Sequence, residues 1–451
     1  MSGLTAAEIE RGRALLVVLR EVWPRFCAEQ RITRTSENIG GQLLAHGARI
    51  LAPRNMFGSA MRLASGVGEA AAGPSTNVPE LLRVWASPVG PTVAIAAGWI
   101  AADQLRSRLP LLEQELGCVM RVSSVGTELH LTLVVADPLS SMVGGEVPPP
   151  PADLERILLG RCENGEWALL PMRDRNGLTF GAEAGSGKTF GINALLAGWV
   201  QHDSVQVACV DGKAGPDYMW LEPRAQALLP TVDRQAVVEV LEPYRDELNR
   251  RTALLRSEFD RWRSAGAEGD APPTSFWHVA ARPDFPLIVI VVDECQVFLS
   301  GSKTKEDKAF ETQLTSVLAD LLNRGRSAGI FTILATQKST TDSIPSVLRD
   351  KVTTRLVGRV STAESVRAAL GRMPVEGEPD PLRLPQRPGM VIVAPESGEL
   401  VIARSWYVPP DELVRLGIRT AHLRRGLPES DGEEGGEVTD GRDDVQGAVA
   451  S

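Results

Sequence analysis

The chain has 451 residues, 43% hydrophobic and 23% charged, which is an ordinary globular composition with room for two or three domains. Its longest apolar run covers 11 residues from Thr92, too few to span a bilayer, and its first residues lack the basic-then-apolar pattern of a secretory signal. These features argue against a membrane-spanning helix. We expect a cytoplasmic protein that acts at a membrane or septum only through a recruiting partner.

The net charge of −9 does not argue against a nucleic-acid partner, because most of it is local. Residues 429–444 hold eight acidic residues and one arginine, a net charge of −7, which leaves −2 for the rest of the chain. A nearly neutral body can still present a basic face. The five cysteines form no C-x-x-C pair, which excludes a zinc signature and a disulfide framework, and we expect Cys209 and Cys295 to be buried.

Three regions precede the central part of the chain. Residues 1–80 read as a helical N-terminal region, whose first helix has one apolar face and is expected to end near Pro24. Residues 81–143 read as strand, helix and strand, which predicts a small α+β domain. The proline-rich stretch at 144–151 predicts a stiff linker and a domain boundary.

Residues 152–412 alternate apolar strand-like runs with amphipathic helices, which predicts a parallel sheet covered by helices. A charged helix is expected from about Asp233 to Arg263. The C-terminal segment at 413–451 ends in the acidic, glycine-rich tail, which we expect to be disordered. Another helix is indicated by one apolar face made of Phe310, Leu314, Val317, Leu318 and Leu321.

The sequence GAEAGSGKT at 181–189 resembles a phosphate-binding loop, whose pattern is G-x-x-x-x-G-K-[ST]. Its leading position holds Ala182 instead of glycine, which is the least disruptive replacement where a small residue is needed. Lys188 would contact the β- and γ-phosphates of ATP, and Thr189 would bind Mg²⁺. The expected nucleotide-binding residues are Ala182, Glu183, Ala184, Gly185, Ser186, Gly187, Lys188 and Thr189.

Polar residues at two later strand ends complete the expected site. Asp293 and Glu294 end the apolar run PLIVIVVDE, and ligands of open α/β sheets bind at such strand ends. We expect Asp293 to hold Mg²⁺ and Glu294 to deprotonate the attacking water. Gln337 ends the next strand, in the sequence ATQ, and is our candidate for sensing the γ-phosphate or placing the water.

With these motifs in place, residues from about 90 to 412 resemble the FtsK/SpoIIIE family of DNA-pumping ATPases. The likeness lies in the loop GAEAGSGKTFGINALL, the strands VACVDGKAG and PLIVIVVDECQVFL, and the segment that runs from NRGRSAGIFTILATQ to VTTRL. It implies a P-loop NTPase (RecA-like) sheet preceded by a small α+β domain. It also implies a bacterial, ring-shaped motor, expected to be a hexamer, that uses ATP and Mg²⁺ to translocate double-stranded DNA without strong sequence preference.

The resemblance also implies a catalytic arginine supplied by a neighbouring subunit. Arg355 falls on the family's threonine-arginine pair and is the expected finger, with Arg326 as second choice. Residues 300–308, which hold three of the seven lysines, are a candidate pore loop, and a plain solvated loop is the alternative. Other arginines that follow the core strands are Arg324, Arg349 and Arg359.

The chain departs from the large family members in lacking a membrane-spanning N-terminus, a glycine at Ala182 and a sequence-reading winged helix. It looks more like the FtsK-like proteins of actinobacterial plasmids and integrative elements, which are linked to DNA transfer between cells; chromosome segregation is the other family role. Three alternatives stay open at this point: an ATPase of a type VII-like protein export system, a replication or partition ATPase, and a non-hydrolysing adaptor.

Overall fold

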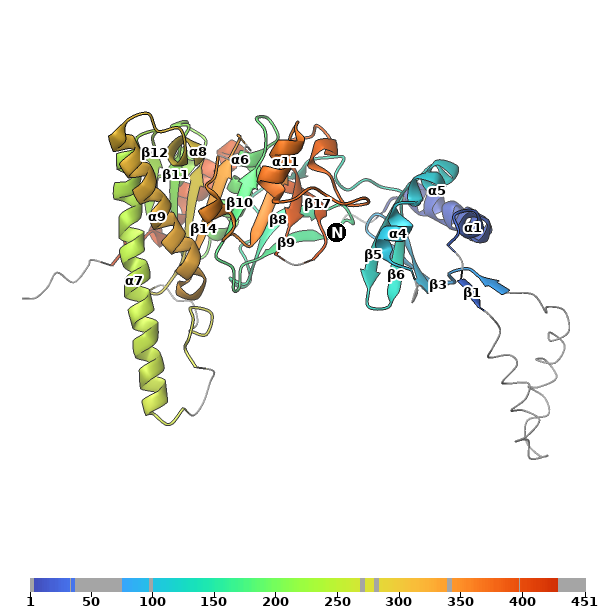
Figure 1. Cartoon of the computed structure of the whole chain (residues 1–451), viewed down its shortest axis with the longest axis horizontal. Coiled ribbons are helices and arrows are strands. Elements are labelled where there is room, and N and C mark those ends of the chain that lie inside the picture. Colours follow the sequence, from blue (N-terminus) through green and yellow to red (C-terminus); the bar gives the residue numbers. More distant parts are fainter. Residues whose placement is uncertain are drawn as a thin grey trace, which may run out of the picture.

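The computed structural model describes residues 4–32, 34–36, 75–96, 100–267, 272–279, 284–338, 343–396 and 398–428. The expected disorder of the acidic tail therefore falls outside the described residues. Figure 1 shows a large α/β body and, beside it, a smaller α+β unit near the start of the chain. Within the described part, no helix is both long and apolar enough to cross a membrane.

A single large sheet organises the α/β body, in the strand order β12-β11-β13-β14-β10-β15-β16-β17-β8-β9, with β7 paired to β17. The six strands from β12 to β15 are parallel. Beyond them, β16, β17, β8 and β9 pair antiparallel, and the short β7 pairs parallel with β17. The predicted helix-covered parallel sheet is confirmed for these six strands, whereas the sheet as a whole is mixed, with antiparallel strands added at one side. The strands are β7 (Val143–Gly144), β8 (Arg156–Cys162), β9 (Trp167–Pro171), β10 (Gly177–Gly181), β11 (Val205–Asp211), β12 (Ala227–Pro230), β13 (Leu287–Asp293), β14 (Ile330–Thr336), β15 (Thr354–Gly358), β16 (Met390–Ala394) and β17 (Val401–Tyr407).

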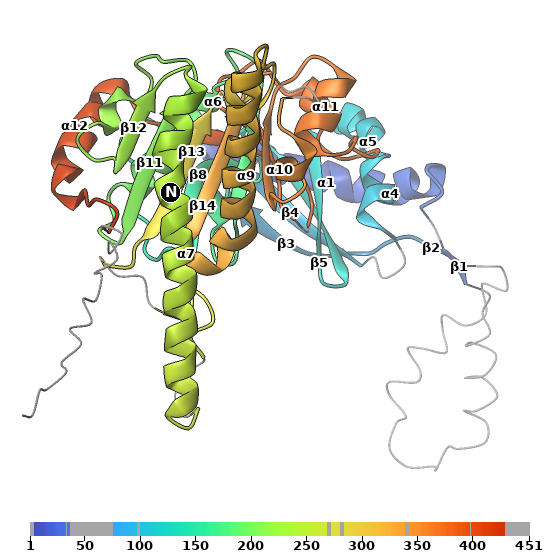
Figure 2. The ribbon, with the colours of Figure 1, turned by 60° about the vertical axis from the view of Figure 1, so that its left-hand side comes forward.

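Helices cover both faces of the sheet because its central strands are apolar on both sides. Every residue of β11, β13 and β14 is buried, as expected of continuous hydrophobic runs in a parallel sheet. One core lies under α6 and α12, and a second lies under α7 and α9. The lower half of α7 extends past the sheet in both views of the ribbon (Figures 1 and 2). The helices are α6 (Lys188–Trp199), α7 (Arg234–Ser264), α8 (Gln296–Leu299), α9 (Lys305–Ala328), α10 (Ser346–Arg349), α11 (Ala363–Leu370) and α12 (Pro410–Thr420).

Helices α7 and α9 match the sequence expectations closely. Asp233 is the N-cap of α7, and its side chain accepts a hydrogen bond from the Gln235 N–H. Four of the five residues predicted for the apolar face of α9 are buried, including Leu314 and Leu321 with no exposed area, and Phe310 is partly buried. The candidate pore loop was expected at 300–308, but only its first part is a loop. Thr304 is the N-cap of α9, and residues 305–308 form the first turn of that helix.

The small unit is a four-stranded antiparallel sheet with the order β3-β4-β6-β5. The expected α+β character holds, but two details differ from the expectation. Strand β3 was not predicted, and the single strand expected after the helices is a hairpin that turns at Gly126, where φ is +61°. The elements are β3 (Leu81–Ser87), β4 (Gly90–Ala96), α4 (Ala102–Arg106), α5 (Leu109–Leu116), β5 (Val119–Val125) and β6 (Glu128–Val134).

The first helix, α1 (Ala6–Glu29), is part of this small unit and not of a separate helical region. Its buried Leu19 and Trp23 pack with Val93 of β4, because the helix needs a partner for its apolar face. It does not end near Pro24 but continues to Glu29, because Phe26 and Cys27 beyond the proline are buried in the same core, which offsets the backbone hydrogen bond that the proline removes. The prediction that residues 1–80 are helical is also wrong at two places. Residues 34–36 and 75–77 form two short strands, β1 (Arg34–Ser36) and β2 (Ser75–Asn77), which pair antiparallel.

The expected boundaries of the α/β body need correction at both ends. Residues of the predicted 144–151 linker are held to the body, since Trp406 Nε1 donates to the Glu146 carbonyl at 2.7 Å and Gln201 Nε2 donates to the Pro148 carbonyl at 2.9 Å. The expected end at 412 falls inside α12, whose apolar face joins the core. The Arg425 N–H then donates to the Gln206 side chain at 3.1 Å, so the body continues beyond α12.

Candidate nucleotide-binding site

The candidate site lies at the carboxyl ends of the parallel strands. The loop at 182–187 connects β10 to α6, and β14 and β13 are the next two strands on one side. Ligands of open α/β sheets bind at this edge, and the positive end of α6 would face a phosphate there. The strand order therefore brings the expected loop and the expected acids to one edge.

Two glycines give the loop its shape. Gly185 and Gly187 have φ values of +79° and +90°, in the left-handed region that other residues rarely adopt. A Cβ at Gly187 would lie 2.2 Å from the Gly389 nitrogen, so this position has no room for a side chain. The Gly389 N–H donates to the Ser186 carbonyl at 2.8 Å, and the Ser186 hydroxyl donates to the Glu183 carbonyl at 2.6 Å. The loop is therefore braced both internally and by the segment before β16.

Ala182 fits the loop because the neighbouring strand leaves space for its methyl group. Ala182 has no exposed area, and its N–H donates to the Thr336 carbonyl at 3.2 Å. A Cβ added at Gly358 of β15 would lie 2.6 Å from the Ala182 Cβ. The missing side chain at Gly358 thus compensates for the extra carbon at Ala182, and the loop keeps its path.

Three buried charges meet beside the loop. Lys188 is 3% exposed, Asp293 0% and Glu294 5%. The Lys188 ammonium forms an ion pair with Asp293 Oδ1 and lies 3.1 Å from Glu294 Oε1. The structure therefore brings the lysine of the loop and both acids of β13 into one cluster, although 105 residues separate Lys188 from Asp293. Such a buried cluster needs its partners, because an unpaired charge would be costly here.

Backbone strain helps to orient Glu294. Its φ is +50°, an unusual value for a residue with a side chain, and such strain gathers at functional sites. The carboxylate oxygen Oε2 accepts hydrogen bonds from the Gln337 N–H at 3.1 Å and from Gln296 Nε2 at 2.8 Å. Gln337 thus touches the site through its backbone. Its side chain is half-buried at the end of β14.

Two further residues join the cluster although the sequence analysis did not select them. The Tyr218 hydroxyl donates to Asp293 Oδ2 at 2.8 Å, and burial raises the pKa of Tyr218 well above its usual value. Asp211 ends β11 in register with Asp293. Burial raises the pKa of the Asp211 carboxyl, although it accepts hydrogen bonds from the N–H groups of Lys213 and Gly215. Asp211 had a signal, a strand-end aspartate, whereas Tyr218 lies in an irregular segment without one.

The donor set fits a magnesium nucleotide. The Asp293 carboxylate and the Thr189 hydroxyl are hard oxygen ligands of the kind that Mg²⁺ prefers. Among the described residues no group of three or more histidine, cysteine or acidic side chains could enclose a metal. Mg²⁺ commonly has few protein ligands and takes the rest from phosphates and water. The site thus suits Mg²⁺ that arrives with ATP.

A cavity of about 320 Å³ opens beside the loop on the side away from β13. Residues 183–186 form one wall, and Arg359, Gln386 and Arg387 form the other. The Gln386 side-chain amide lies against the Arg359 guanidinium, with a closest approach of 2.6 Å. Arg387 also donates to Asp137 at 2.9 Å, which connects this wall with the segment that leads from the small unit.

The expected trans-acting arginine lies outside this cluster. Arg355 is on β15, in register with Thr179 of β10, and its Nη2 donates to the Arg349 carbonyl at 3.4 Å. Burial lowers the pKa of its guanidinium, and its Nη1 has no hydrogen-bond partner in the described part of the chain. The second choice, Arg326, is exposed in the last turn of α9. Neither arginine joins the cluster around Lys188.

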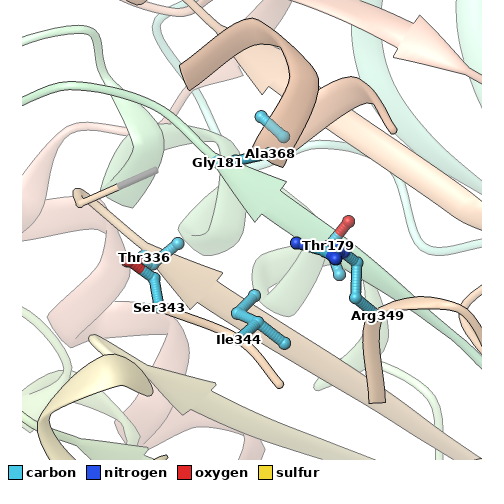
Figure 3. A pocket seen from close by; sticks show the side chains of 8 residues that line it. Thr179, Gly181, Thr336, Ser343, Ile344, Arg349 and Ala368 are labelled. Atoms are coloured by element: carbon cyan, nitrogen blue, oxygen red, sulfur yellow. The ribbon is translucent and has the colours of Figure 1, made fainter. Parts of the chain in front are cut away.

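Figure 3 shows a small pocket on the face of the sheet opposite α6, between β10, β14 and α11. Its volume of about 20 Å³ suffices for one water molecule and not for a nucleotide. The labelled side chains come from strands, the α10 segment and α11. They are Thr179, Gly181, Thr336, Ser343, Ile344, Arg349 and Ala368.

A phosphate loop between a strand and a helix, with paired acids two strands away, defines a P-loop ATPase fold. Among solved structures, the pCW3 conjugation coupling protein TcpA with ATPgS matches 77% of this chain and 94% of its own, with a TM-score of 0.52 and 15% identity. That likeness concerns the fold alone. Residues 157–341 match the model of the FtsK/SpoIIIE family.

Curated relatives extend the match beyond this domain. A DNA translocase FtsK of Treponema pallidum is 25% identical over 283 residues, which are 62% of this chain and 32% of that protein. DNA translocase FtsK 2 of Ralstonia nicotianae is 25% identical over 335 residues, 70% of this chain and 41% of that protein. The chain thus spans less than half of the length of these relatives.

Proposed function

We propose that this protein is an ATPase that uses hydrolysis to translocate double-stranded DNA. One observation carries the ATPase part of the proposal: Lys188 of the loop meets Asp293 and Glu294 in one buried cluster at the carboxyl edge of the sheet. A lysine, a metal-binding acid and a second acid are what phosphoryl transfer to water needs. A mere glycine-rich turn would not need the second acid.

Each residue of the cluster has a distinct role in this proposal. The loop N–H groups and Lys188 bind the phosphates, which would draw the ammonium away from Asp293 and Glu294. Mg²⁺, held by Asp293 and Thr189, would neutralise charge on the phosphates. Glu294, fixed at its strained backbone position, orients the attacking water and accepts its proton. Gln337 places the water or senses the γ-phosphate.

The DNA part of the proposal is supported by the relatives. The curated relatives are named DNA translocases, and TcpA is named a conjugation coupling protein. Contact with DNA would be to phosphates and largely independent of sequence. Transfer of a plasmid or integrative element between bacterial cells is the process we favour, with chromosome segregation second.

We further propose a ring of subunits, taken to be a hexamer, with nucleotide bound between neighbours. Arg355 lies away from the Lys188 cluster of its own chain, which is the placement that a finger acting on a neighbour requires. In this arrangement the protein works in the bacterial cytoplasm, and a partner recruits it to a membrane or septum.

Two substitutions separate nucleotide binding from hydrolysis. Lys188→Ala should abolish both, because the phosphates lose their main cation. Glu294→Gln should keep nucleotide binding and lower turnover by a factor of about 10² or more, because the proton acceptor is lost. Binding is measured by titration calorimetry and turnover by phosphate release. The matched controls are Lys351→Ala and Glu306→Gln, which change the same residue types outside the site. If Glu294→Gln hydrolyses at the wild-type rate, the assigned role of Glu294 is wrong.

A further inference from the structure

An exposed aromatic side chain lies next to the phosphate loop. Phe190 follows Thr189 in the first turn of α6, and 41% of its surface is exposed. Its ring meets the ring of Tyr407 on β17 nearly edge-on, with 5.2 Å between centroids and an interplanar angle of 77°. Most other residues of α6 are buried, so this large apolar surface at its start has no role in the core.

The strand order indicates which part of a nucleotide would approach this pair. The acids that act on the γ-phosphate are on β13, two strands to one side of β10. Tyr407 is on β17, three strands to the other side, and α6 packs against β17. A triphosphate whose γ end lies at Lys188 and Glu294 must therefore lead its sugar and base toward the β17 side of the loop.

We propose that Phe190 and Tyr407 form the wall on which the base of the bound nucleotide stacks. The inference rests on the proposed nucleotide site and adds the residues that bind the base. An exposed aromatic ring offers a flat apolar surface on which any base can stack. Ser405 lies two residues before Tyr407, on the same face of β17. Its side chain is buried and has no hydrogen-bond partner among the described residues, so β17 also offers a polar group between itself and α6.

A pair of ligands with and without a base tests the proposal. The full chain is titrated with the non-hydrolysable analogue AMP-PNP and with inorganic tripolyphosphate, both with Mg²⁺. Phe190→Ala should weaken AMP-PNP about tenfold and leave tripolyphosphate unchanged. Phe190→Tyr should bind AMP-PNP as the wild type does. Tyr407→Leu is a second variant with the same expected selectivity, and thermal melts check that every variant folds.

Three outcomes would overturn the inference. Equal weakening of both ligands by Phe190→Ala would mean that the residue supports the loop and not the base. Unchanged binding of AMP-PNP would remove Phe190 from the site. Base-selective weakening by Arg359→Ala alone would place the base in the cavity beside Gln386. If the wild type binds neither ligand, the proposed function itself fails. That result differs from the three outcomes above, in which the wild type still binds.

Discussion

At the scale of single residues, the methyl group of Ala182 and the bare Cα of Gly358 occupy complementary positions. These two residues lie far apart in the sequence, and only the fold brings them together. The departure from the glycine of the pattern is therefore matched by a second glycine. We infer that Ala182 does not weaken nucleotide binding.

This pairing predicts a rescue. Gly358→Ala alone should destabilise the body by about 1–3 kcal/mol, because its Cβ would overlap the Ala182 methyl. Its backbone conformation allows alanine, so the effect comes from packing. Adding Ala182→Gly should recover most of the loss, as measured by urea unfolding. Additive effects of the two changes would contradict the pairing.

The sequence predicted most of the candidate site. Lys188, Asp293 and Glu294 carry a pattern that depends on local chemistry, and the fold brings them together. Tyr218 could not be predicted, because an irregular segment places it and its contact with Asp293 depends on the tertiary structure. The role of Gly358 was hidden for the same reason.

At the scale of elements, a buried charge cluster joins α7 to the sheet and to α9. The side chains of Glu247 and Arg251 are 4% and 1% exposed, and Arg251 also donates to the Pro286 and Ala328 carbonyls at 2.8 and 2.9 Å. Burial raises the pKa of Glu247, but hydrogen bonds from Arg250 and Arg251 outweigh it, so the pKa lies below its usual value. Glu247 therefore stabilises the fold in its charged form.

Glu247→Gln should lower the free energy of unfolding by about 3–5 kcal/mol, because it leaves Arg251 buried without its partner charge. Urea unfolding measures the change. The control Glu258→Gln, in the exposed pair with Arg261, should change stability by less than about 0.5 kcal/mol. Because the pKa of Glu247 is lower in the folded state, its charge stabilises the fold at pH values above the pKa of an unfolded glutamate. This stabilisation is lost as the pH falls through the lowered pKa. The difference between wild type and Glu247→Gln should thus shrink below about pH 4. A difference independent of pH would contradict the ionic explanation.

Elements with a strong period were predicted well, and short antiparallel strands were not. The limits of α7 and α9 follow from capping residues and apolar faces that the sequence displays. Strand β3 escaped prediction because it is largely exposed and has no clean alternation. The antiparallel strands β16 and β17 pair with each other, as do β8 and β9, but the pairing of β17 with β8 joins segments distant in sequence, which local patterns do not reveal.

At the scale of the whole molecule, polar contacts join the small unit to the body. Arg121 Nε lies 3.0 Å from Glu163 Oε2, and Arg106 Nη2 lies 2.9 Å from Glu399 Oε2. Arg387, in the wall of the cavity beside the phosphate loop, forms an ion pair with Asp137. The proline-rich stretch that the sequence marked as a linker also bonds to the body, through Trp406 and Gln201.

The placement of Arg355 predicts complementation between subunits. Arg355→Ala should bind nucleotide but not hydrolyse it, and Lys188→Ala should do neither. When the two inactive variants are mixed in equal amounts, they should assemble into rings of random order and recover turnover. About a quarter of the interfaces then pair an intact loop with an intact Arg355 of the neighbour. Normal hydrolysis by Arg355→Ala alone would show that Arg355 is not the finger, and Arg326 would be the next candidate.

The central claim is tested most directly by the rate of phosphate release with and without long double-stranded DNA, with Lys188→Ala as the blank. The account predicts strong stimulation by duplex, less by single strands, and loss of stimulation at high salt, where phosphate contacts are screened. Turnover that does not respond to DNA would contradict the account and favour a protein-export ATPase or another activator. No turnover at all would leave the loop as a nucleotide-binding site without catalysis.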